Sequence, residues 1–242
     1  MMNKSKIVKN KRGGKSPLKQ SASPKHNIDL FELAQKKGLS PVDYCNYKAG
    51  KIGMCYTKNK ENSNEYSSIL HNTCSNGSFI MQKELIDFEN SLAEFLGCKH
   101  AIGVADGTAA LIFALKSSGI QKGNEVIVSS HTFIATAAAV HHVGAIPIVC
   151  DCFPDSTFDY RSAEKLITNK TFALMPTQLN GRCSNMDEIS KLAHRYKLKI
   201  IEDSCQALGA KFKGCNAGLF GIAGSYSFYP AKTLGCFGDG GA

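Results

Sequence analysis

The chain has 242 residues, of which 43% are apolar, and this is enough for the core of one large domain with an extension. Its net charge of +9 is concentrated at the N-terminus, where residues 1–27 hold eight of the 29 Lys and Arg residues and none of the acidic ones. The longest apolar stretch, 133–150, is interrupted by two histidines, a glycine and a proline, which argues against a membrane span.

Ten cysteines raise the question of disulfides or a zinc site, and their spacing favours neither. There is no Cys-x-x-Cys pair, and Cys150 and Cys152 have no matching second pair. The N-terminus is charged but lacks the apolar core of a secretory signal. We therefore expect reduced cysteines, no bound metal and a cytoplasmic location.

Two segments precede the regular part of the chain. Residues 1–27 are basic, contain Ser, Pro and Gly, and have few apolar residues, which is typical of a disordered tail. Nucleic-acid binding by this tail is an alternative with little support, because base-reading or aromatic side chains are absent from it. Residues 28–75 are an unassigned extension, in which 28–37 have helix-like spacing.

From residue 78 onward, apolar runs of two kinds alternate. Residues 79–96 have helical spacing, with Leu85, Phe88, Leu92 and Phe95 on one face. Beyond them, short runs rich in Val and Ile, typical of parallel strands covered on both faces, alternate with helical segments. This alternation predicts an α/β fold with a doubly wound, mostly parallel sheet. The predicted strands are 101–104, 125–128, 146–149, 172–175, 199–202 and 225–229, and the predicted helices 108–117, 134–142, 162–167 and 186–196.

Ligands of such sheets bind beyond the carboxyl ends of the strands, so the residues that follow each strand matter most. Gly107 and Thr108 follow the strand at 101–104 and open a helix, whose free N–H groups suit a phosphate. A plain helix N-cap is the simpler explanation of this pair taken alone. Phe133 follows the strand at 125–128 and either stacks on a planar ligand or packs in the core.

Two charged residues also follow predicted strands. Asp203 comes directly after 199–202, where a buried carboxylate needs a cation or several hydrogen bonds, unless it only caps the next helix. Lys232 lies in a Pro-Ala-Lys turn after 225–229, where an amine can be partly desolvated and act as a nucleophile. Together these residues offer four features: a phosphate site, a flat surface, an acid for a ring nitrogen and an amine for an aldehyde. This set matches the needs of pyridoxal 5'-phosphate.

Several motifs between residues 79 and 242 carry a resemblance to a known family. The two most specific are Glu-Asp-Ser-Cys-Gln-Ala-Leu-Gly-Ala at 202–210 and Ser-Phe-Tyr-Pro-Ala-Lys at 227–232. With these the chain resembles the DegT/DnrJ/EryC1/StrS sugar aminotransferases, which have the aspartate-aminotransferase-like fold and depend on pyridoxal 5'-phosphate. The other motifs lie at 88–89, 107–111, 123–128, 132–136 and 144–147.

The resemblance implies a role for each residue at the cofactor ring. Lys232 is then the catalytic residue, which forms a Schiff base with the cofactor and carries the proton. Asp203 pairs with the pyridinium nitrogen. Gln206 contacts the ring or its 3-hydroxyl from the face opposite Phe133.

By the same resemblance, Gly107, Thr108 and Ser227 hold the cofactor phosphate. Two departures from the family's pattern bear on the site. Asp106 puts an acid near the phosphate, unless its side chain points away. The Gln-Leu-Asn-Gly sequence at 178–181 stands where the family often has His-Leu-Tyr-Gly, which leaves the contacts made there undefined.

The resemblance also sets the expected domains and function. Residues 76–242 are the cofactor-binding large domain, and the family's small C-terminal domain is absent, so we expect a truncated member. The implied reaction transfers an amino group from an amino acid, expected to be glutamate, to a nucleotide-linked keto sugar, for amino-sugar and polysaccharide biosynthesis. We expect the complete protein to be a homodimer. The alternatives are a member that only binds cofactor or dimerises, and a protein in which the basic tail is the functional part.

Overall fold

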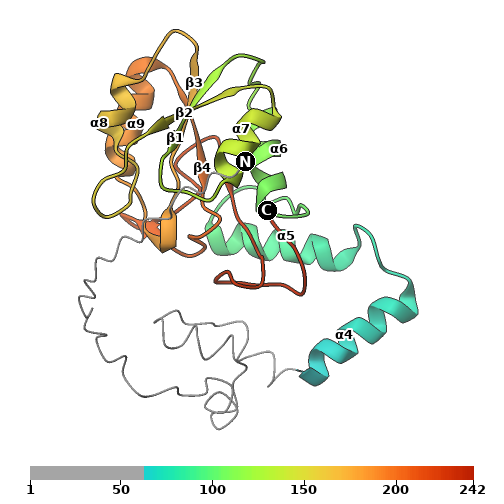
Figure 1. Cartoon of the computed structure of the whole chain (residues 1–242). Coiled ribbons are helices and arrows are strands. Elements are labelled where there is room, and N and C mark those ends of the chain that lie inside the picture. Colours follow the sequence, from blue (N-terminus) through green and yellow to red (C-terminus); the bar gives the residue numbers. More distant parts are fainter. Residues whose placement is uncertain (1–62) are drawn as a thin grey trace, which may run out of the picture.

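The computed structural model describes residues 63–242, so the expected tail, the helix at 28–37 and most of the extension at 28–75 lie outside the described residues (Figure 1). The helices are α4 (Ser63–Asn76), α5 (Lys83–Leu96), α6 (Gly107–Ser117), α7 (Ala135–His142), α8 (Tyr160–Lys165) and α9 (Met186–Tyr196), with a 3-10 turn, η1, at Leu179–Gly181. The strands are β1 (Glu125–Ser129), β2 (Ile146–Cys150), β3 (Thr171–Met175), β4 (Lys199–Asp203), β5 (Lys211–Phe212), β6 (Cys215–Asn216) and β7 (Ala223–Ser225).

Five strands form one sheet in the order β2-β1-β3-β4-β7, and every neighbouring pair is parallel. The predicted doubly wound α/β fold is therefore confirmed. From β1 the chain passes to β2 on one side and then returns to β3 on the other. The order thus reverses between β1 and β3, and ligands of open α/β sheets bind outside the carboxyl ends of the strands at such a point.

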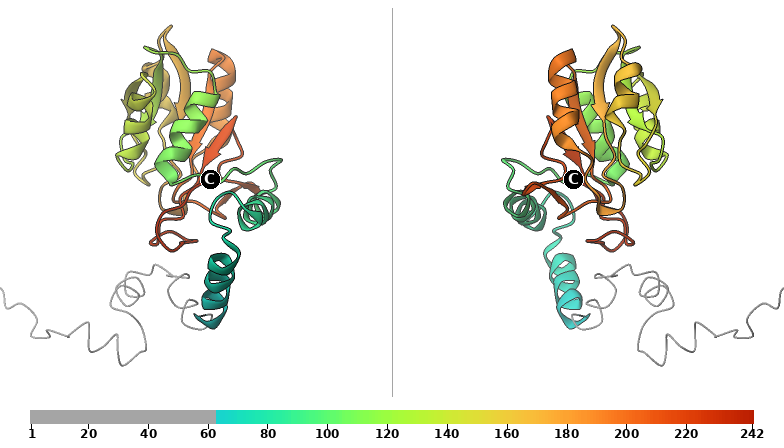
Figure 2. Two further views of the ribbon diagram at one scale, coloured as in Figure 1. Left: turned by 90° about the vertical axis from the view of Figure 1, so that its right-hand side faces the viewer. Right: turned by 90° about the vertical axis from the view of Figure 1, so that its left-hand side faces the viewer.

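The inner strands β1, β3 and β4 are buried on both faces, and alternate residues of each strand point to opposite faces. Val126 and Val128 of β1 pack with residues of α6 and α7, whereas Ile127 packs with residues of α8 and α9. All three side chains are fully buried, and burying a side chain of this size stabilises the fold by roughly 1.5–3 kcal/mol. Figure 2 shows the sheet between these two layers of helices.

Two predicted strands are wrong in their extent. Within 101–104 only Val104 pairs, in an isolated antiparallel bridge with Gly241. Of 225–229, only Ser225 belongs to β7, because the chain then leaves β4 and pairs with the glycine-rich segment at 240–242 instead. A Cβ added at Gly241 would lie 2.4 Å from the Asp106 carbonyl oxygen, so a glycine makes this close approach possible.

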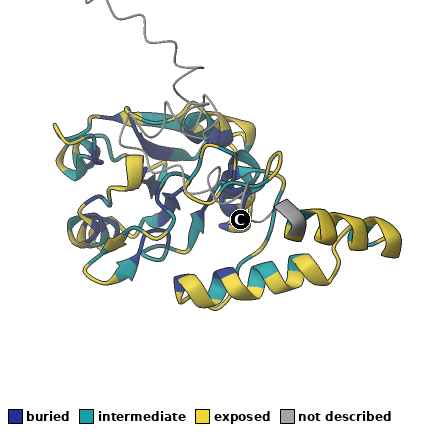
Figure 3. Ribbon diagram, turned by 90° about the horizontal axis from the view of Figure 1, so that it is seen from below, coloured by how far each residue is buried: buried dark blue, intermediate teal, exposed yellow. Residues whose placement is uncertain are grey.

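The helical predictions differ most at the N-terminal end of the described chain. The helix expected at 79–96 begins at Lys83, and Phe95, expected on its apolar face, is 60% exposed, whereas Leu96 is buried. Helix α4 was not predicted, nor was the hairpin of β5 and β6. Figure 3 shows that α4 and much of α5 are exposed. None of the helices within 63–242 has the length and apolar character of a membrane span.

Candidate functional site

Asp203 is the last residue of β4, and its side chain is only 5% exposed. Its two oxygens have separate donors. Thr136 Oγ1 donates to Oδ2 at 2.6 Å, and the backbone N–H of Cys205 donates to Oδ1 at 3.2 Å. A buried carboxylate needs such donors, and they fix its orientation at the carboxyl end of the sheet.

Three threonine hydroxyls form a chain that leads to this acid. Thr177 Oγ1 donates to Thr132 Oγ1 at 3.0 Å, and Thr132 Oγ1 lies 2.6 Å from Thr136 Oγ1. Thr177 follows β3, Thr132 follows β1, and Thr136 belongs to α7. None of these threonines has a role that is predicted from the sequence. The available signal was a pair of threonines four residues apart, directly after a buried strand.

The thiol of Cys205 lies within reach of both predicted charges. Burial raises the pKa of this thiol and the Asp203 carboxylate raises it further, whereas the charge of Lys232 lowers it. Lys232 is half-buried and ends a turn in which its N–H donates to the Tyr229 carbonyl at 2.8 Å. The acid and the amine therefore both act on the pKa of this one thiol.

Gly107 is buried at the start of α6, where the chain is tightly packed. A Cβ at this position would lie 2.8 Å from Cys205 Sγ and 2.8 Å from Ser227 Cβ. Only a glycine fits here without displacing these neighbours, so the start of α6 packs closely against Ser227 and Cys205. The first N–H groups of a helix have no partner within the helix and carry the positive end of its dipole, which suits a phosphate.

Asp106, the departure noted beside this position, caps α6. Its Oδ1 accepts a hydrogen bond from the Ala109 N–H at 2.7 Å. The carboxylate is therefore engaged with the first turn of the helix. Thr108 is the second residue of α6 and is half-buried.

Gln206 and Phe133, the two residues predicted to flank the ring, differ from each other in their exposure and contacts. Gln206 is half-buried, and its Oε1 accepts a hydrogen bond from the Asn180 N–H at 3.1 Å. Phe133 precedes α7 and is 66% exposed. Cys205 contacts Asp203 and Gly107, and Phe133 is not part of these contacts.

The Gln-Leu-Asn-Gly sequence at 178–181 proves to belong to a buried network. The Gln178 amide nitrogen donates to Glu202 Oε2 at 2.8 Å, and its oxygen accepts from the Ser184 N–H at 2.7 Å. Glu202 also accepts from the Gly218 N–H at 2.9 Å and the Phe220 N–H at 2.6 Å. Burial raises the pKa of Glu202, and these donors oppose the rise.

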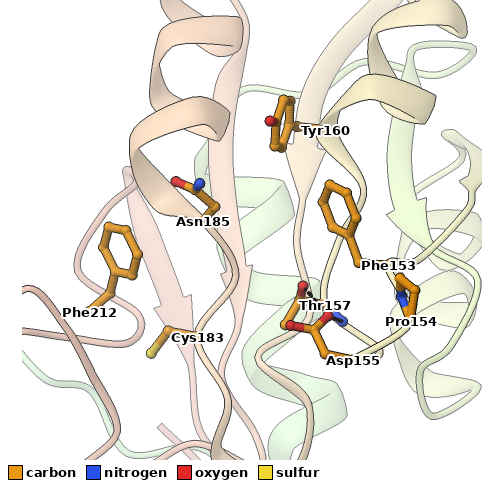
Figure 4. Close-up of a pocket in the computed structure, with 8 residues that line it drawn as sticks. All are labelled: Phe153, Pro154, Asp155, Thr157, Tyr160, Cys183, Asn185 and Phe212. Atoms are coloured by element: carbon orange, nitrogen blue, oxygen red, sulfur yellow. Dashed lines mark hydrogen bonds between the residues drawn. The ribbon is translucent and has the colours of Figure 1, made fainter.

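Two cavities lie outside this cluster. The cavity in Figure 4 has a volume of about 500 Å³, and none of its lining residues is a predicted site residue. A second cavity of about 600 Å³ borders the bridge between Val104 and Gly241. We place the candidate site at the carboxyl ends of the strands, because the buried acid ends β4 and the N-terminus of α6 packs against Cys205, two residues beyond it. The first cavity is lined by Phe153, Pro154, Asp155, Thr157, Tyr160, Cys183, Asn185 and Phe212.

Comparison with known proteins gives consistent matches. Residues 60–242 match the model of the DegT/DnrJ/EryC1/StrS aminotransferase family. The dTDP-3-amino-3,4,6-trideoxy-alpha-D-glucose transaminase of Streptomyces venezuelae is 42% identical over 179 residues, which are 74% of this chain and 47% of that protein. The UDP-2-acetamido-2-deoxy-3-oxo-D-glucuronate aminotransferase of Pseudomonas aeruginosa is 38% identical over 167 residues, 69% of this chain and 46% of that protein. The chain thus spans about half the length of these relatives.

Solved structures match over a similar range. The crystal structure of DesV from S. venezuelae in complex with a ketimine intermediate has a TM-score of 0.73 at 40% identity, and the match covers 76% of this chain and 50% of that one. NtdA from Bacillus subtilis, with bound cofactor PMP, has a TM-score of 0.70 at 33% identity, covering 75% and 41% of the two chains.

Proposed function

Because this chain belongs to the DegT/DnrJ/EryC1/StrS aminotransferase family, we propose that it acts in the transfer of an amino group to a nucleotide-linked keto sugar, with pyridoxal 5'-phosphate as cofactor. The relatives named above are transaminases whose names specify amino or keto sugars linked to dTDP or UDP. The observation that supports the proposal is the surroundings of Cys205: its N–H donates to Asp203, its Sγ lies 3.9 Å from the Gly107 carbonyl oxygen, and the charge of Lys232 lowers the pKa of its thiol.

The residues present fit this cofactor. Gly107 and Ser227 lie close together at the N-terminus of α6, where the first N–H groups of the helix and the Ser227 hydroxyl suit a phosphate. Asp203 is a buried acid with fixed oxygens, which suits a protonated ring nitrogen. When bound, pyridoxal phosphate supplies an aldehyde that condenses with amines and a ring that withdraws electrons.

Each residue then has a defined task. Nζ of Lys232 holds the cofactor and, once released, carries the proton taken from Cα of the amino donor. The negative charge of Asp203 stabilises the protonated form of the ring nitrogen. Thr108 and Ser227 offer hydroxyls to the phosphate, while Gln206 and Phe133 are proposed to contact opposite faces of the ring.

Borohydride trapping tests the central assignment. The unmodified chain, loaded with pyridoxal 5'-phosphate and reduced, should absorb visible light before reduction and afterwards carry a covalent label on the peptide that contains Lys232. Lys232→Ala should lose both signals. Lys191→Ala is the matched control, because Lys191 is an exposed lysine of α9 whose Nζ lies 2.6 Å from Glu188. Retention of the absorbance in Lys232→Ala, or a label on another lysine, would sink the proposal.

Finer parts of the proposal concern donor, assembly and location. We propose glutamate as the amino donor and a homodimer as the assembly. We also propose a cytoplasmic location, supported by eight free cysteines among residues 63–242. A turnover assay with glutamate and a keto-sugar nucleotide, on protein whose bound cofactor has been verified, separates this function from cofactor binding without turnover.

A further inference from the structure

The threonine chain beside Asp203 has only one possible direction of donation. A carboxylate accepts hydrogen bonds and donates none, so the hydrogen of the Thr136 hydroxyl must point to Asp203 Oδ2. A threonine hydroxyl has a single hydrogen. The short contact between Thr136 and Thr132 must therefore use the hydrogen of Thr132, and Thr132 in turn accepts from Thr177.

The burial of the threonine hydrogen bonds strengthens their effect on Asp203. Thr136 is fully buried and Thr177 is 3% exposed, so these bonds form where the dielectric constant is low. The three hydroxyls come from the ends of β1 and β3 and from α7, and the acid from the end of β4. The row of threonine hydroxyls therefore crosses the point between β1 and β3 where the strand order reverses. It connects Asp203, at the end of β4, to the ends of both of these strands.

We propose that Thr136, Thr132 and Thr177 are positioning residues that hold the Asp203 carboxylate against the cofactor ring nitrogen. This inference rests on the proposed function, because it requires a ligand with a protonated ring nitrogen. Thr136 donates to Oδ2 and the Cys205 N–H donates to Oδ1, so the two bonds together favour one orientation of the carboxylate. All three O–H dipoles point toward the acid and stabilise its negative charge.

The test compares two ligands of the full chain: pyridoxal 5'-phosphate, and its analogue with a C–H group in place of the ring nitrogen. Thr136→Val keeps the side-chain shape and removes the hydroxyl. It should weaken binding of pyridoxal 5'-phosphate by about tenfold, as expected for loss of a hydrogen bond to a charged group, and leave binding of the analogue unchanged. Thr132→Val and Thr177→Val should give progressively smaller losses of affinity for pyridoxal 5'-phosphate. Thr136→Ser, which keeps the hydroxyl, should bind it as tightly as the unmodified chain.

Thr168→Val is the matched control, because Thr168 also donates to a carboxylate, that of Glu125, but lies on the exposed surface. Its affinity for both ligands should equal that of the unmodified chain. An equal loss for both ligands in Thr136→Val would show a purely structural role and overturn the inference, as would an unchanged affinity for pyridoxal 5'-phosphate. Failure of the unmodified chain to bind pyridoxal 5'-phosphate would instead overturn the proposed function itself. Thr136→Ser and Thr177→Val keep the comparison possible if Thr136→Val fails to fold.

Discussion

Glu202 is a fully buried acid beside the proposed site, and it links three segments of the chain. Its oxygens accept hydrogen bonds from Gln178, Gly218 and Phe220. An unpaired buried charge is costly, so these donors determine whether Glu202 can remain ionised. Asp203 follows Glu202 directly, so the network also anchors the end of β4 that carries the proposed partner of the ring nitrogen.

We predict that Gln178→Leu makes stability more dependent on pH. Burial raises the pKa of Glu202 above its usual 4.5, and a raised carboxyl pKa means that stability is greatest below the unfolded-state pKa and falls as the pH rises through the folded-state value. Loss of the Gln178 donor should raise that pKa further. The free energy of unfolding should drop by about 2 kcal/mol at pH 7 and by less at pH 4, as measured by urea denaturation.

Gln121→Leu is the control for this prediction, since the Gln121 amide contacts the exposed Gly119 carbonyl and no acid. It should change stability little at either pH. A deficit in Gln178→Leu that is the same at pH 4 and pH 7 would mean that only the hydrogen bond to the Ser184 N–H matters.

The sequence indicates Asp203 and Lys232 because each follows an apolar run, and a motif gives each a proposed role. It does not reveal Thr136 in the same way. Thr136 is 67 residues from Asp203 in the sequence, and threonine is common at helix starts, so its hydrogen-bond partner is visible only in the folded chain. Gln178 is a similar case, because the role of its amide depends on its hydrogen bond to a buried carboxylate 24 residues away.

At the scale of elements, the cap of α6 sets the electrostatics of the proposed phosphate site. Asp106 caps this helix, and its negative charge lies beside the first-turn N–H groups that a phosphate would use. A side-chain cap stabilises a helix, whereas a second negative charge repels a phosphate. The two effects of this one residue can be separated by substitution.

We predict that Asp106→Asn keeps the cap, leaves the free energy of unfolding nearly unchanged and strengthens binding of pyridoxal 5'-phosphate severalfold. Asp106→Ala should lose about 1 kcal/mol of unfolding free energy, because the Ala109 N–H then has no side-chain acceptor. Urea denaturation and cofactor titration measure the two effects. If Asp106→Asn and the unmodified chain bind the cofactor with equal affinity, the prediction that the Asp106 charge repels the phosphate is wrong.

Elements with strong local signals could be predicted from the sequence, and those held by distant contacts could not. Helix α9 has the predicted bounds, because its apolar residues recur with helical period and Asn185 caps its first turn. The strand at 225–229 was predicted too long, because its apolar residues give no sign that their partners change from β4 to the glycines at 240–241. Helix α4 has a weakly patterned sequence, and a ring contact between Tyr66 and Phe237 joins it to the end of the described chain.

At the scale of the whole molecule, the connection between α4 and α5 exposes adjacent apolar side chains. Phe79, Ile80 and Met81 are 68%, 75% and 80% exposed. Contiguous exposed apolar residues of this size mark interaction surfaces. They support the proposed homodimer, with this segment in its interface.

We predict that Ile80→Glu shifts the protein from dimer to monomer, because a carboxylate buried in the interface would be desolvated without a partner. Sedimentation velocity at several concentrations measures the shift. Ile222→Glu is the control, since Ile222 is also exposed (56%) but precedes β7, at the amino end of that strand. A monomeric unmodified chain, or an unchanged dimer in Ile80→Glu, would refute the placement of the interface.

The antiparallel bridges made by Gly241 join two segments that are far apart in the sequence. One glycine joins Val104, just before α6, to Ser227, one of the residues proposed to hold the phosphate. Neither bridge exists until almost all of the described residues have left the exit tunnel. A nascent chain can therefore form its sheet first, and it gains these two bridges only after Gly241 has emerged.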